Sequence, residues 1–315
     1  MHIGYGKIIL LGEHFVVHGL PAIVAALDLV TTAEIVQLDS LLGGCWGPAL
    51  RSHLGAVGER PAIKIIDNRP KVPTYKPLKT KEYEQMVHAV FNILNVTAPS
   101  VVTFSGTLPV TNGGIGASAA AAVALARALN HKFNLNLSSD QINQVAFCGE
   151  QKVHGTPSGI DNAAATFGGI FAFKKEKERN LLSGNALLKI VIADSGRATN
   201  TKQVLAAVNT HKLQNLAKSY TKLFEQAHAA LVHNDLVSLG QAMSQNHTLL
   251  QELGVSSPEL DSLVSCALEH GALGAKLTGT GCGGLMIALA PDAQTQENIA
   301  HAFKTAGFFT ITQNI

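Results

Sequence analysis

Residues 112–120 read Asn-Gly-Gly-Ile-Gly-Ala-Ser-Ala-Ala and continue into an alanine-rich run that reaches Leu129. The run has the length and composition of a helix, which places the glycines in a loop at a helix N-terminus. Glycine lets the backbone approach a ligand closely, and a helix N-terminus presents free N–H groups and a positive dipole to an anion such as phosphate. No Gly-Lys-Ser or Gly-Lys-Thr follows, so this is not a Walker motif. The loop is either a phosphate-binding loop, with Ser118 in reach of a phosphate-bound Mg²⁺, or a tight structural turn.

A second unusual segment lies near the start of the chain. Lys7 opens a short apolar run that is closed by Gly12, a pattern typical of a buried strand, and Glu13 and His14 follow directly. A lysine that opens a buried strand, and an acid with a histidine at its end, are poorly explained by packing alone. The alternative is a lysine whose ammonium reaches solvent and a surface turn at residues 13–14.

Two further segments concentrate proline, glycine and polar residues. Residues 154–162 read His-Gly-Thr-Pro-Ser-Gly-Ile-Asp-Asn, and their rigid turn fixes the direction of Asp161, as a general base requires. The alternative is that Asp161 caps a helix that begins at Asn162. Residues 276–284 read Lys-Leu-Thr-Gly-Thr-Gly-Cys-Gly-Gly and precede a strand, so their amides either surround an anion or only turn the chain. Two glycine-rich loops, a buried lysine and a rigid aspartate together suit phosphoryl transfer, which needs positioning and charge neutralisation.

The periodicity predicts strands and helices that are mixed along the chain rather than strictly alternating, which favours the α+β class over a doubly wound sheet. Strands are predicted at 7–11, 22–27, 32–38, 63–66, 101–105, 169–173, 189–194 and 285–289. Helices are predicted at 82–94, 117–129 and 213–231. Three further helices are predicted from their start signals: one after a capping box at Ser138 and Gln141, one after a cap at Asn234, and one from Ser257-Pro258 to Gly271. The charged stretch 174–179 separates two domains, which we place at residues 1–180 and 181–315.

The composition excludes several classes of protein. Charged residues make up 15% and hydrophobic residues 46% of the 315 residues, which excludes a disordered chain. The 24 Lys and Arg against 22 Asp and Glu give a net charge of +2, so we expect no nucleic-acid partner. We see no targeting segment and no membrane span, and the four cysteines form no Cys-x-x-Cys pair, so we expect a cytoplasmic protein with reduced thiols and no membrane partner. The mean hydropathy of +0.19 is high for a soluble monomer, and a homodimer interface would account for part of it.

In their order and spacing, the four segments resemble the GHMP kinase superfamily, which comprises galactokinases, homoserine kinases, mevalonate kinases and phosphomevalonate kinases. Residues 6–19 and 154–162 resemble the mevalonate kinases most, whereas galactokinases would have Arg in place of Lys7 and Thr-Asp-Tyr after Glu-His. Residues 276–284 resemble the third superfamily motif. The chain departs from the usual pattern at Asn112 and Ala117, which replace a Gly and a Ser of the loop, and at Cys282, which interrupts a glycine run.

The resemblance implies a fold and a set of roles. It implies an N-terminal domain like ribosomal protein S5 domain 2 and a ferredoxin-like C-terminal domain, with ATP and mevalonate between them. Asp161 would be the catalytic base for the 5-hydroxyl of mevalonate and Lys7 the catalytic cation beside it. Mg²⁺ would bind Ser118 and Glu150, and mevalonate would contact Glu13, His14 and Thr201. The ATP phosphates would be bound by Asn112, Gly113, Gly114, Ile115, Gly116, Ala117 and Ser118, and by Gly279 and Gly281.

Two alternatives stay open at the level of the sequence. One is a sister kinase acting on phosphomevalonate or another small alcohol. A phosphorylated substrate would need an additional basic cluster in the pocket, and the sequence reveals none. The other is a catalytically inactive binding or regulatory module, which Ala117 and Cys282 suggest and which the intact set of Lys7, Glu150 and Asp161 opposes.

Overall fold

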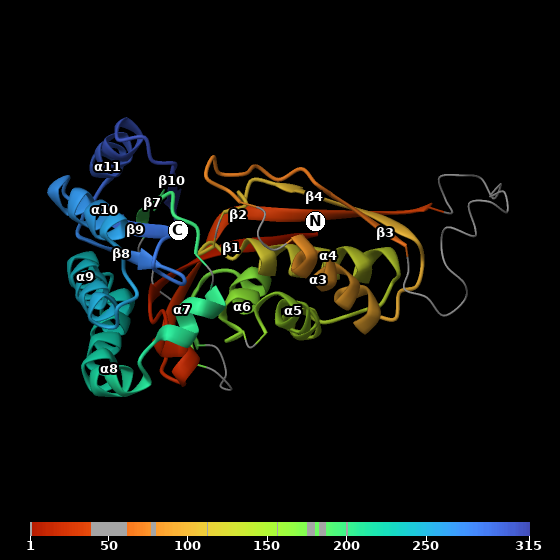
Figure 1. Ribbon diagram of the computed structural model, residues 1–315, viewed down its shortest axis with the longest axis horizontal. Helices are drawn as coiled ribbons and strands as arrows, with labels where there is room; N and C mark the ends of the chain where they lie inside the picture. Colours follow the sequence, from red (N-terminus) through yellow and green to blue (C-terminus); the bar gives the residue numbers. More distant parts are fainter. Residues whose placement is uncertain are drawn as a thin grey trace.

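The computed structural model describes residues 2–38, 62–76, 80–111, 113–155, 157–174, 180–182, 187–199 and 201–315. Within these ranges the strands form two sheets in two lobes, which lie side by side along the long axis of the molecule (Figure 1). Strands up to Leu181 build the first sheet, and strands from Lys189 onward build the second. The α+β class is therefore confirmed, while the domain boundary at 180/181 stays a prediction.

The first sheet is organised around one long strand. β2 (Ala22–Gln37) pairs antiparallel with β1 (Ile3–Leu11), β4 (Ser100–Gly106) and β5 (Ile170–Phe173). β3 (Ile63–Asp67) adds in parallel to β4, and the short β6 (Asn180–Leu181) pairs with β5. The prediction of two separate strands at 22–27 and 32–38 is wrong. The exposed Asp28 interrupts the apolar pattern, but the backbone stays extended because Val30 and Thr31 pair with Tyr5 and Gly4.

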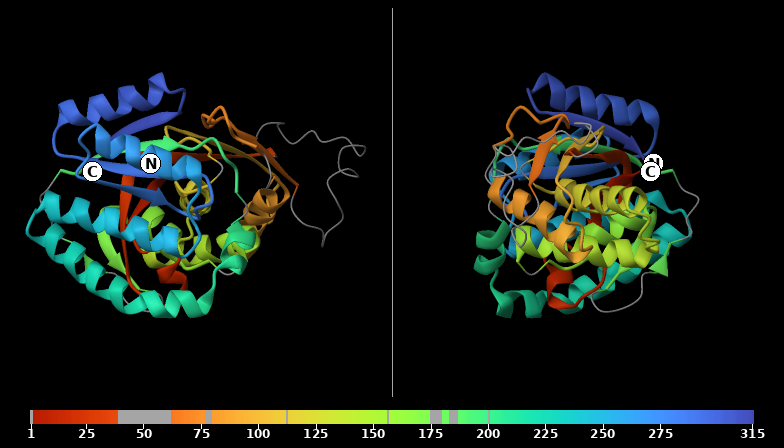
Figure 2. Two further views of the ribbon diagram at one scale, coloured as in Figure 1. Left: turned by 60° about the vertical axis from the view of Figure 1, so that its left-hand side comes forward. Right: turned by 90° about the vertical axis from the view of Figure 1, so that its right-hand side faces the viewer.

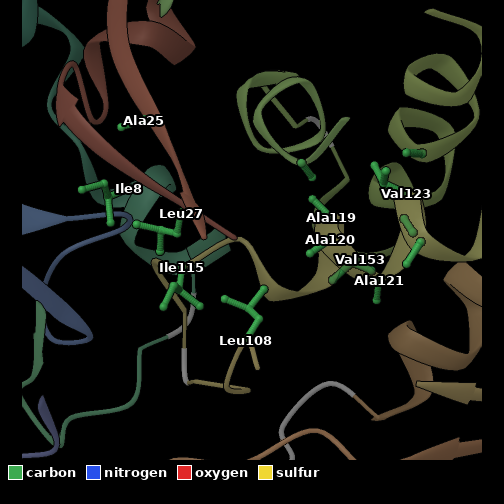
Figure 3. Close-up of a cluster of buried hydrophobic side chains, with 14 of the residues drawn as sticks. Ile8, Ala25, Leu27, Leu108, Ile115, Ala119, Ala120, Ala121, Val123 and Val153 are labelled. Carbon is green, nitrogen blue, oxygen red and sulfur yellow. The ribbon is translucent and has the colours of Figure 1, made fainter. Parts of the chain in front are cut away.

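Helices cover one face of this sheet: α3 (Thr80–Ile93), α4 (Ala117–Lys132), α5 (Ser139–His154) and α6 (Ile160–Phe167) (Figure 1). α4 is buried nearly all round, because residues 119–126 are all inaccessible. Its alanines leave room for close neighbours, and Figure 3 shows Ala119, Ala120 and Ala121 in the cluster that also contains Val153 of α5. The alanine-rich run of the sequence is thus the central helix of the N-terminal lobe.

The second sheet has the strand order β10-β7-β9-β8, and all its neighbouring pairs are antiparallel. Its strands are β7 (Lys189–Asp194), β8 (Gly274–Thr278), β9 (Leu285–Ala290) and β10 (Thr310–Asn314). α7 (Thr201–Ala207), α8 (Thr210–Val232), α9 (Leu236–Glu252) and α10 (Pro258–Glu269) lie between β7 and β8, and α11 (Ala293–Thr305) lies between β9 and β10. α8 and α9 run side by side (Figure 2). The order of strands and helices is that of a ferredoxin-like domain with additional helices.

Both faces of the second sheet are buried. Ile190 of β7 and Ile287 of β9 belong to the large core shared with the first lobe. Their neighbours Val191 and Met286 point the other way and pack in the cluster formed with α10 and α11. Because successive residues of a strand face opposite sides, burial of both faces requires continuous apolar runs, as the sequence has at 189–194 and 285–289.

The helix ends follow local capping chemistry. The Ser138–Gln141 capping box is confirmed, and Ser257 caps α10 with Pro258 at its first position. α10 ends at Glu269, short of the predicted Gly271. The predicted Asn234 cap is wrong, because the Asp235 carboxylate accepts the Ser238 N–H instead.

In the described ranges no helix is both long and apolar enough to cross a bilayer. α8 has 23 residues, and it carries charged side chains at Lys212, Lys218, Lys222 and Glu225. Its apolar residues pack toward the two cores rather than around the whole helix.

Candidate active site

A cavity of about 490 Å³ lies where segments from both lobes meet. Its lining comes from β1 and the turn after it, the loops before α3 and α4, the end of α5, the start of α6, and the loop after β8. It includes most of the residues assigned to a site from the sequence: Lys7, Glu13, His14, Gly113, Gly114, Gly116, Ala117, Ser118, Glu150, Asp161 and Gly279. The four segments singled out by their sequence therefore converge on one cavity.

The other predicted site residues lie elsewhere or are not fully described. The Ile115 side chain packs in the core near Leu27 and Leu108 (Figure 3), and Gly281 is buried where a Cβ would meet the Val255 carbonyl oxygen. Thr201 is the first residue of α7, but its side chain lies outside the described part of the structure, as does the whole of Asn112. The predicted roles of these four residues in binding ATP or mevalonate stay predictions.

Lys7 and Asp161 form an ion pair at the cavity, with 3.2 Å between Nζ and Oδ1. The Lys7 side chain is 3% exposed and also donates to the Gly114 carbonyl at 3.1 Å, whereas the Asp161 side chain keeps 34% exposure. α6 begins one residue before Asp161, and its N-cap Gly159 makes no side-chain capping bond. Lys7 is therefore not a lysine that reaches solvent, and Asp161 is not a helix cap. The pair places a carboxylate beside a buried ammonium at the edge of a cavity.

The first glycine-rich loop packs tightly against this pair. Gly116 is the N-cap of α4 with a left-handed φ of 75°, and a Cβ there would lie 3.0 Å from the Lys7 Cγ. The backbone of the loop thus approaches Lys7 more closely than a larger residue would allow. The first N–H groups of α4 have no intrahelical acceptor, and Ala117 and Ser118 of this turn line the cavity. The loop has the geometry of an anion site at a helix N-terminus.

Ser118 and Glu150 present oxygen atoms to the same cavity. The Ser118 hydroxyl donates to Glu150 Oε2 at 3.2 Å, and Glu150 is buried at the end of α5. Hydroxyl and carboxylate oxygens are ligands that Mg²⁺ prefers, and Mg²⁺ typically combines one or two protein ligands with phosphate oxygens and waters. The described residues contain no cluster of three or more His, Cys, Asp or Glu side chains suited to a metal. The Ser118–Glu150 pair therefore fits a phosphate-bound Mg²⁺ rather than a metal held by the protein alone.

Glu13 and His14 are buried, with 1% and 4% exposure, so the surface-turn alternative is wrong. His14 Nε2 lies 2.7 Å from the Thr280 carbonyl oxygen, and because a carbonyl only accepts, Nε2 carries the proton. Burial lowers the pKa of His14 to about 4, so the ring is neutral near pH 7. Its Nδ1 atom is then a hydrogen-bond acceptor.

Glu13 has a partner that sequence reasoning missed. The Lys276 ammonium donates to Glu13 Oε1 and to the Leu277 carbonyl at 2.6 Å, and both charged side chains are completely buried. Desolvation raises the pKa of Glu13 and lowers that of Lys276, and their mutual attraction opposes both shifts. Lys7 is close enough to act on both groups. Two ion pairs, one at the cavity edge and one fully buried, therefore lie beside each other.

The second glycine-rich loop rests on the first. Gly279 has a φ of 92°, and a Cβ there would lie 2.6 Å from the Cα of Gly114. Cys282 is held in a left-handed conformation, with a φ of 56°, and its N–H donates to the Val255 carbonyl at 2.7 Å. Gly279 thus allows contact between the loops at the cavity, while residues 281–282 fix the loop to the C-terminal lobe.

Comparison with known proteins agrees with this arrangement. The family model for the GHMP kinases N terminal domain matches residues 83–169, and the model for GHMP kinases C terminal matches residues 227–308. Mevalonate kinase from Thermococcus sibiricus is 32% identical over 98% of this chain and 94% of that protein, and the one from Thermococcus onnurineus is 33% identical over 96% and 91%. The crystal structure of L. major mevalonate kinase in complex with R-mevalonate is 35% identical, with a TM-score of 0.85 over 99% of this chain and 95% of that one.

The chain belongs to the mevalonate kinase family. Its GHMP kinase fold, predicted from the resemblance, is confirmed.

The loop after β3 carries a basic group into the cavity of this mevalonate kinase family member. Arg69 is 4% exposed, and its guanidinium donates to both oxygens of Asp67 at 2.9 and 2.7 Å and to the Ala117 carbonyl at 2.8 Å. Lys71 and Lys76 of the same loop also line the cavity. No additional basic cluster could be located from the sequence, but the structure places these three basic side chains at the cavity. The only local signal was the Asp-x-Arg spacing after a strand.

A hydrogen bond joins this loop to the C-terminal lobe. The Thr74 hydroxyl donates to Asp194 Oδ2 at 2.8 Å, and the Gly196 N–H donates to the other oxygen of Asp194 at 2.9 Å. Asp194 is the last residue of β7 and is 2% exposed. The loop that carries the basic side chains is thereby held at the junction of the lobes.

Proposed function

We propose that this protein transfers the γ-phosphoryl group of ATP to the 5-hydroxyl of mevalonate, giving 5-phosphomevalonate and ADP. Membership of the mevalonate kinase family and the similarity to a mevalonate-bound relative support the substrate. The observation that carries the chemistry is the Lys7–Asp161 pair, which lies at the cavity beside the first glycine-rich loop. The proposal includes two domains, residues 1–180 and 181–315.

In this proposal Asp161 is the general base. It accepts the proton of the 5-hydroxyl as the oxygen forms a bond to the γ-phosphorus, and the bond from that phosphorus to the bridging oxygen of ADP breaks. Its place in the first turn of α6 fixes its direction, and geometry of this kind matters before pKa for a base. The nearby Lys7 ammonium stabilises the carboxylate and the negative charge that develops on the attacking oxygen.

The first loop and its neighbours bind the nucleotide in the same proposal. Amides at the start of α4 and the glycines of residues 113–116 surround the phosphates, and Gly279 closes the other side. Ser118 and Glu150 would hold Mg²⁺, which neutralises phosphate charge when bound. Lys71 and Lys76 add positive charge to the cavity.

Glu13, His14 and Thr201 orient mevalonate in the proposal. The first two line the cavity next to Lys7, and α7, which begins at Thr201, contributes Leu205 to the lining. A site that pairs substrate polar groups with fixed buried partners rejects analogues that lack those groups by up to about 10⁴-fold. We therefore expect kcat/KM to be much higher for mevalonate than for galactose or homoserine.

The test is an ADP-release assay with four acceptors: mevalonate, phosphomevalonate, homoserine and galactose. Phosphomevalonate belongs in the panel because Lys71 and Lys76 supply the basic charge that a phosphorylated acceptor would need. We expect kcat/KM to be highest for mevalonate by at least about 100-fold. Comparable turnover of phosphomevalonate would favour the sister kinase, and no turnover of any acceptor would favour the inactive module.

A further inference from the structure

The buried Glu13–Lys276 pair joins the two lobes behind the cavity. Glu13 follows β1 in the first lobe, and Lys276 lies in β8 of the second. Besides Glu13, the ammonium donates to the backbone carbonyls of Leu277 at 2.6 Å and Ile9 at 3.4 Å. These three acceptors match the three N–H groups of the ammonium, which therefore holds the Glu13 carboxylate in place.

The other oxygen of that carboxylate has a different environment. Glu13 Oε2 is almost completely buried and has no hydrogen-bond partner among the described residues, although Glu13 lines the cavity. His14 Nδ1 is equally buried and has no partner in the same ranges. Since Nε2 of His14 donates to the Thr280 carbonyl, Nδ1 is an acceptor, as is the carboxylate oxygen. The unpartnered buried atoms of these two neighbouring residues are thus both acceptors.

An acceptor-only surface selects its ligand group by chemistry. An ionised carboxylate or phosphate oxygen has no proton to donate, so it would leave both acceptors without a partner. A hydroxyl group can donate its proton and satisfy such an acceptor. If Asp161 takes the proton of the 5-hydroxyl, the group that suits these acceptors is the other hydroxyl of mevalonate, at carbon 3.

We propose that Lys276 is a positioning residue that fixes Glu13 so that its carboxylate accepts the hydrogen bond of the non-reacting hydroxyl of the acceptor substrate, with His14 beside it. Lys276 is not among the cavity-lining residues and acts through Glu13. This inference rests on the proposed function, because it assigns one hydroxyl of mevalonate to this part of the cavity.

The test compares mevalonate with its analogue that lacks the 3-hydroxyl, in the wild type and in Lys276→Met. The wild type should prefer mevalonate in kcat/KM by about 100-fold or more, as a site built for a hydroxyl does. Lys276→Met should raise KM for mevalonate by about 10- to 100-fold, the scale of a hydrogen bond to a charged group, and reduce the preference by a similar factor. KM for ATP should change by less than about threefold.

Two further variants separate positioning from folding. Leu277→Ala lies on the same strand but faces the C-terminal core, so it should lower stability while keeping the wild-type preference for the 3-hydroxyl. Glu13→Gln/Lys276→Met leaves no unpaired buried charge, so it should fold even where Lys276→Met does not, and it should still show the reduced preference.

The outcomes are distinct. A wild type that phosphorylates neither compound contradicts the proposed function itself. A wild type that phosphorylates both equally well, or variants at Lys276 that keep the full preference, overturns the inference and leaves the proposed function standing. Equal loss of preference in Leu277→Ala would also overturn it, because the effect would then come from reduced stability alone.

Discussion

Replacing Lys7 by methionine should reduce the rate far more than it reduces stability. The substitution removes two interactions of one ammonium, the 3.1 Å bond to the Gly114 carbonyl and the 3.2 Å pair with Asp161. Because the Asp161 side chain is 34% exposed, water can replace part of the stabilisation that its carboxylate loses when the Lys7 ammonium is removed. The main structural cost is the unpaired carbonyl, so the free energy of unfolding should fall by about 1–2 kcal/mol.

Lys7→Met should raise the free energy of the transition state by more than it lowers the free energy of unfolding. The ammonium stands where charge develops on the attacking oxygen, and loss of one such preorganised group typically lowers kcat by about 10²- to 10³-fold. Binding of mevalonate before the reaction does not require that charge, so its Kd should change little. Steady-state ADP release gives kcat, titration calorimetry without nucleotide gives Kd, and urea denaturation gives the stability.

Arg127→Met is the matched control. Its guanidinium also joins β1 to α6, by bonds to the Ile3 and Thr166 carbonyls at 2.5 and 2.6 Å, but Arg127 does not line the cavity. The free energy of unfolding of Arg127→Met should fall by about 1–2 kcal/mol, as for Lys7→Met, while kcat stays within about threefold of the wild type. A Lys7→Met enzyme with kcat within about threefold of the wild type, or an equal loss of kcat in Arg127→Met, would show that the Lys7 ammonium does not stabilise the attacking oxygen.

Four further predictions follow from the site. Asp161→Asn should lower kcat by about 10²-fold or more and leave ATP binding intact by calorimetry; near-normal turnover would exclude Asp161 as the base. Ser118→Ala should raise KM for Mg–ATP and spare mevalonate binding measured without nucleotide, and the opposite pattern would contradict the loop assignment. Gly279→Ala forces a Cβ to within 2.6 Å of Gly114, so it should raise KM for ATP about tenfold and cost about 1–2 kcal/mol or more. Gly254→Ala, with φ 78° and open space, should show the stability loss without the KM change. The pKa of His14 is about 4 in the folded chain against 6.5 ordinarily, so the stability that neutral His14 contributes is complete above pH 6.5 and is lost as the pH falls toward 4. His14→Gln should therefore flatten that part of the stability–pH curve in denaturant titrations, and an unchanged curve would contradict the assignment.

The strands and helices that sequence alone predicted correctly are those with an unambiguous local pattern. β7 and β9 are apolar on both faces because both faces are buried, and α10 begins with a serine cap and a proline. β2 was predicted as two strands because its middle contains the exposed Asp28. Pairing with β1 keeps this part extended, and pairing partners are not encoded in the local pattern.

The site residues likewise include some that could be identified from the sequence and some that could not. Segments such as Lys7 with Glu13 and His14, or the turn before Asp161, could be identified because their unusual residues are adjacent in the chain. Lys276 was missed because its partner Glu13 lies 263 residues away. Arg69 was missed because its local signal, an Asp-x-Arg spacing in a segment with Pro70 and Pro73, does not reveal its contact with Ala117, which depends on how the lobe folds. Long-range pairs of this kind follow from topology rather than from spacing.

Phosphorus NMR of a reaction that contains the protein, Mg–ATP and mevalonate follows the transfer of the phosphoryl group to the 5-hydroxyl of mevalonate. We expect a single new phosphomonoester signal, coupled to the methylene protons of carbon 5, that grows in step with the β-phosphate signal of ADP. Inorganic phosphate appearing with ADP and no phosphomonoester, or no consumption of ATP at all, would show that the cavity does not phosphorylate mevalonate.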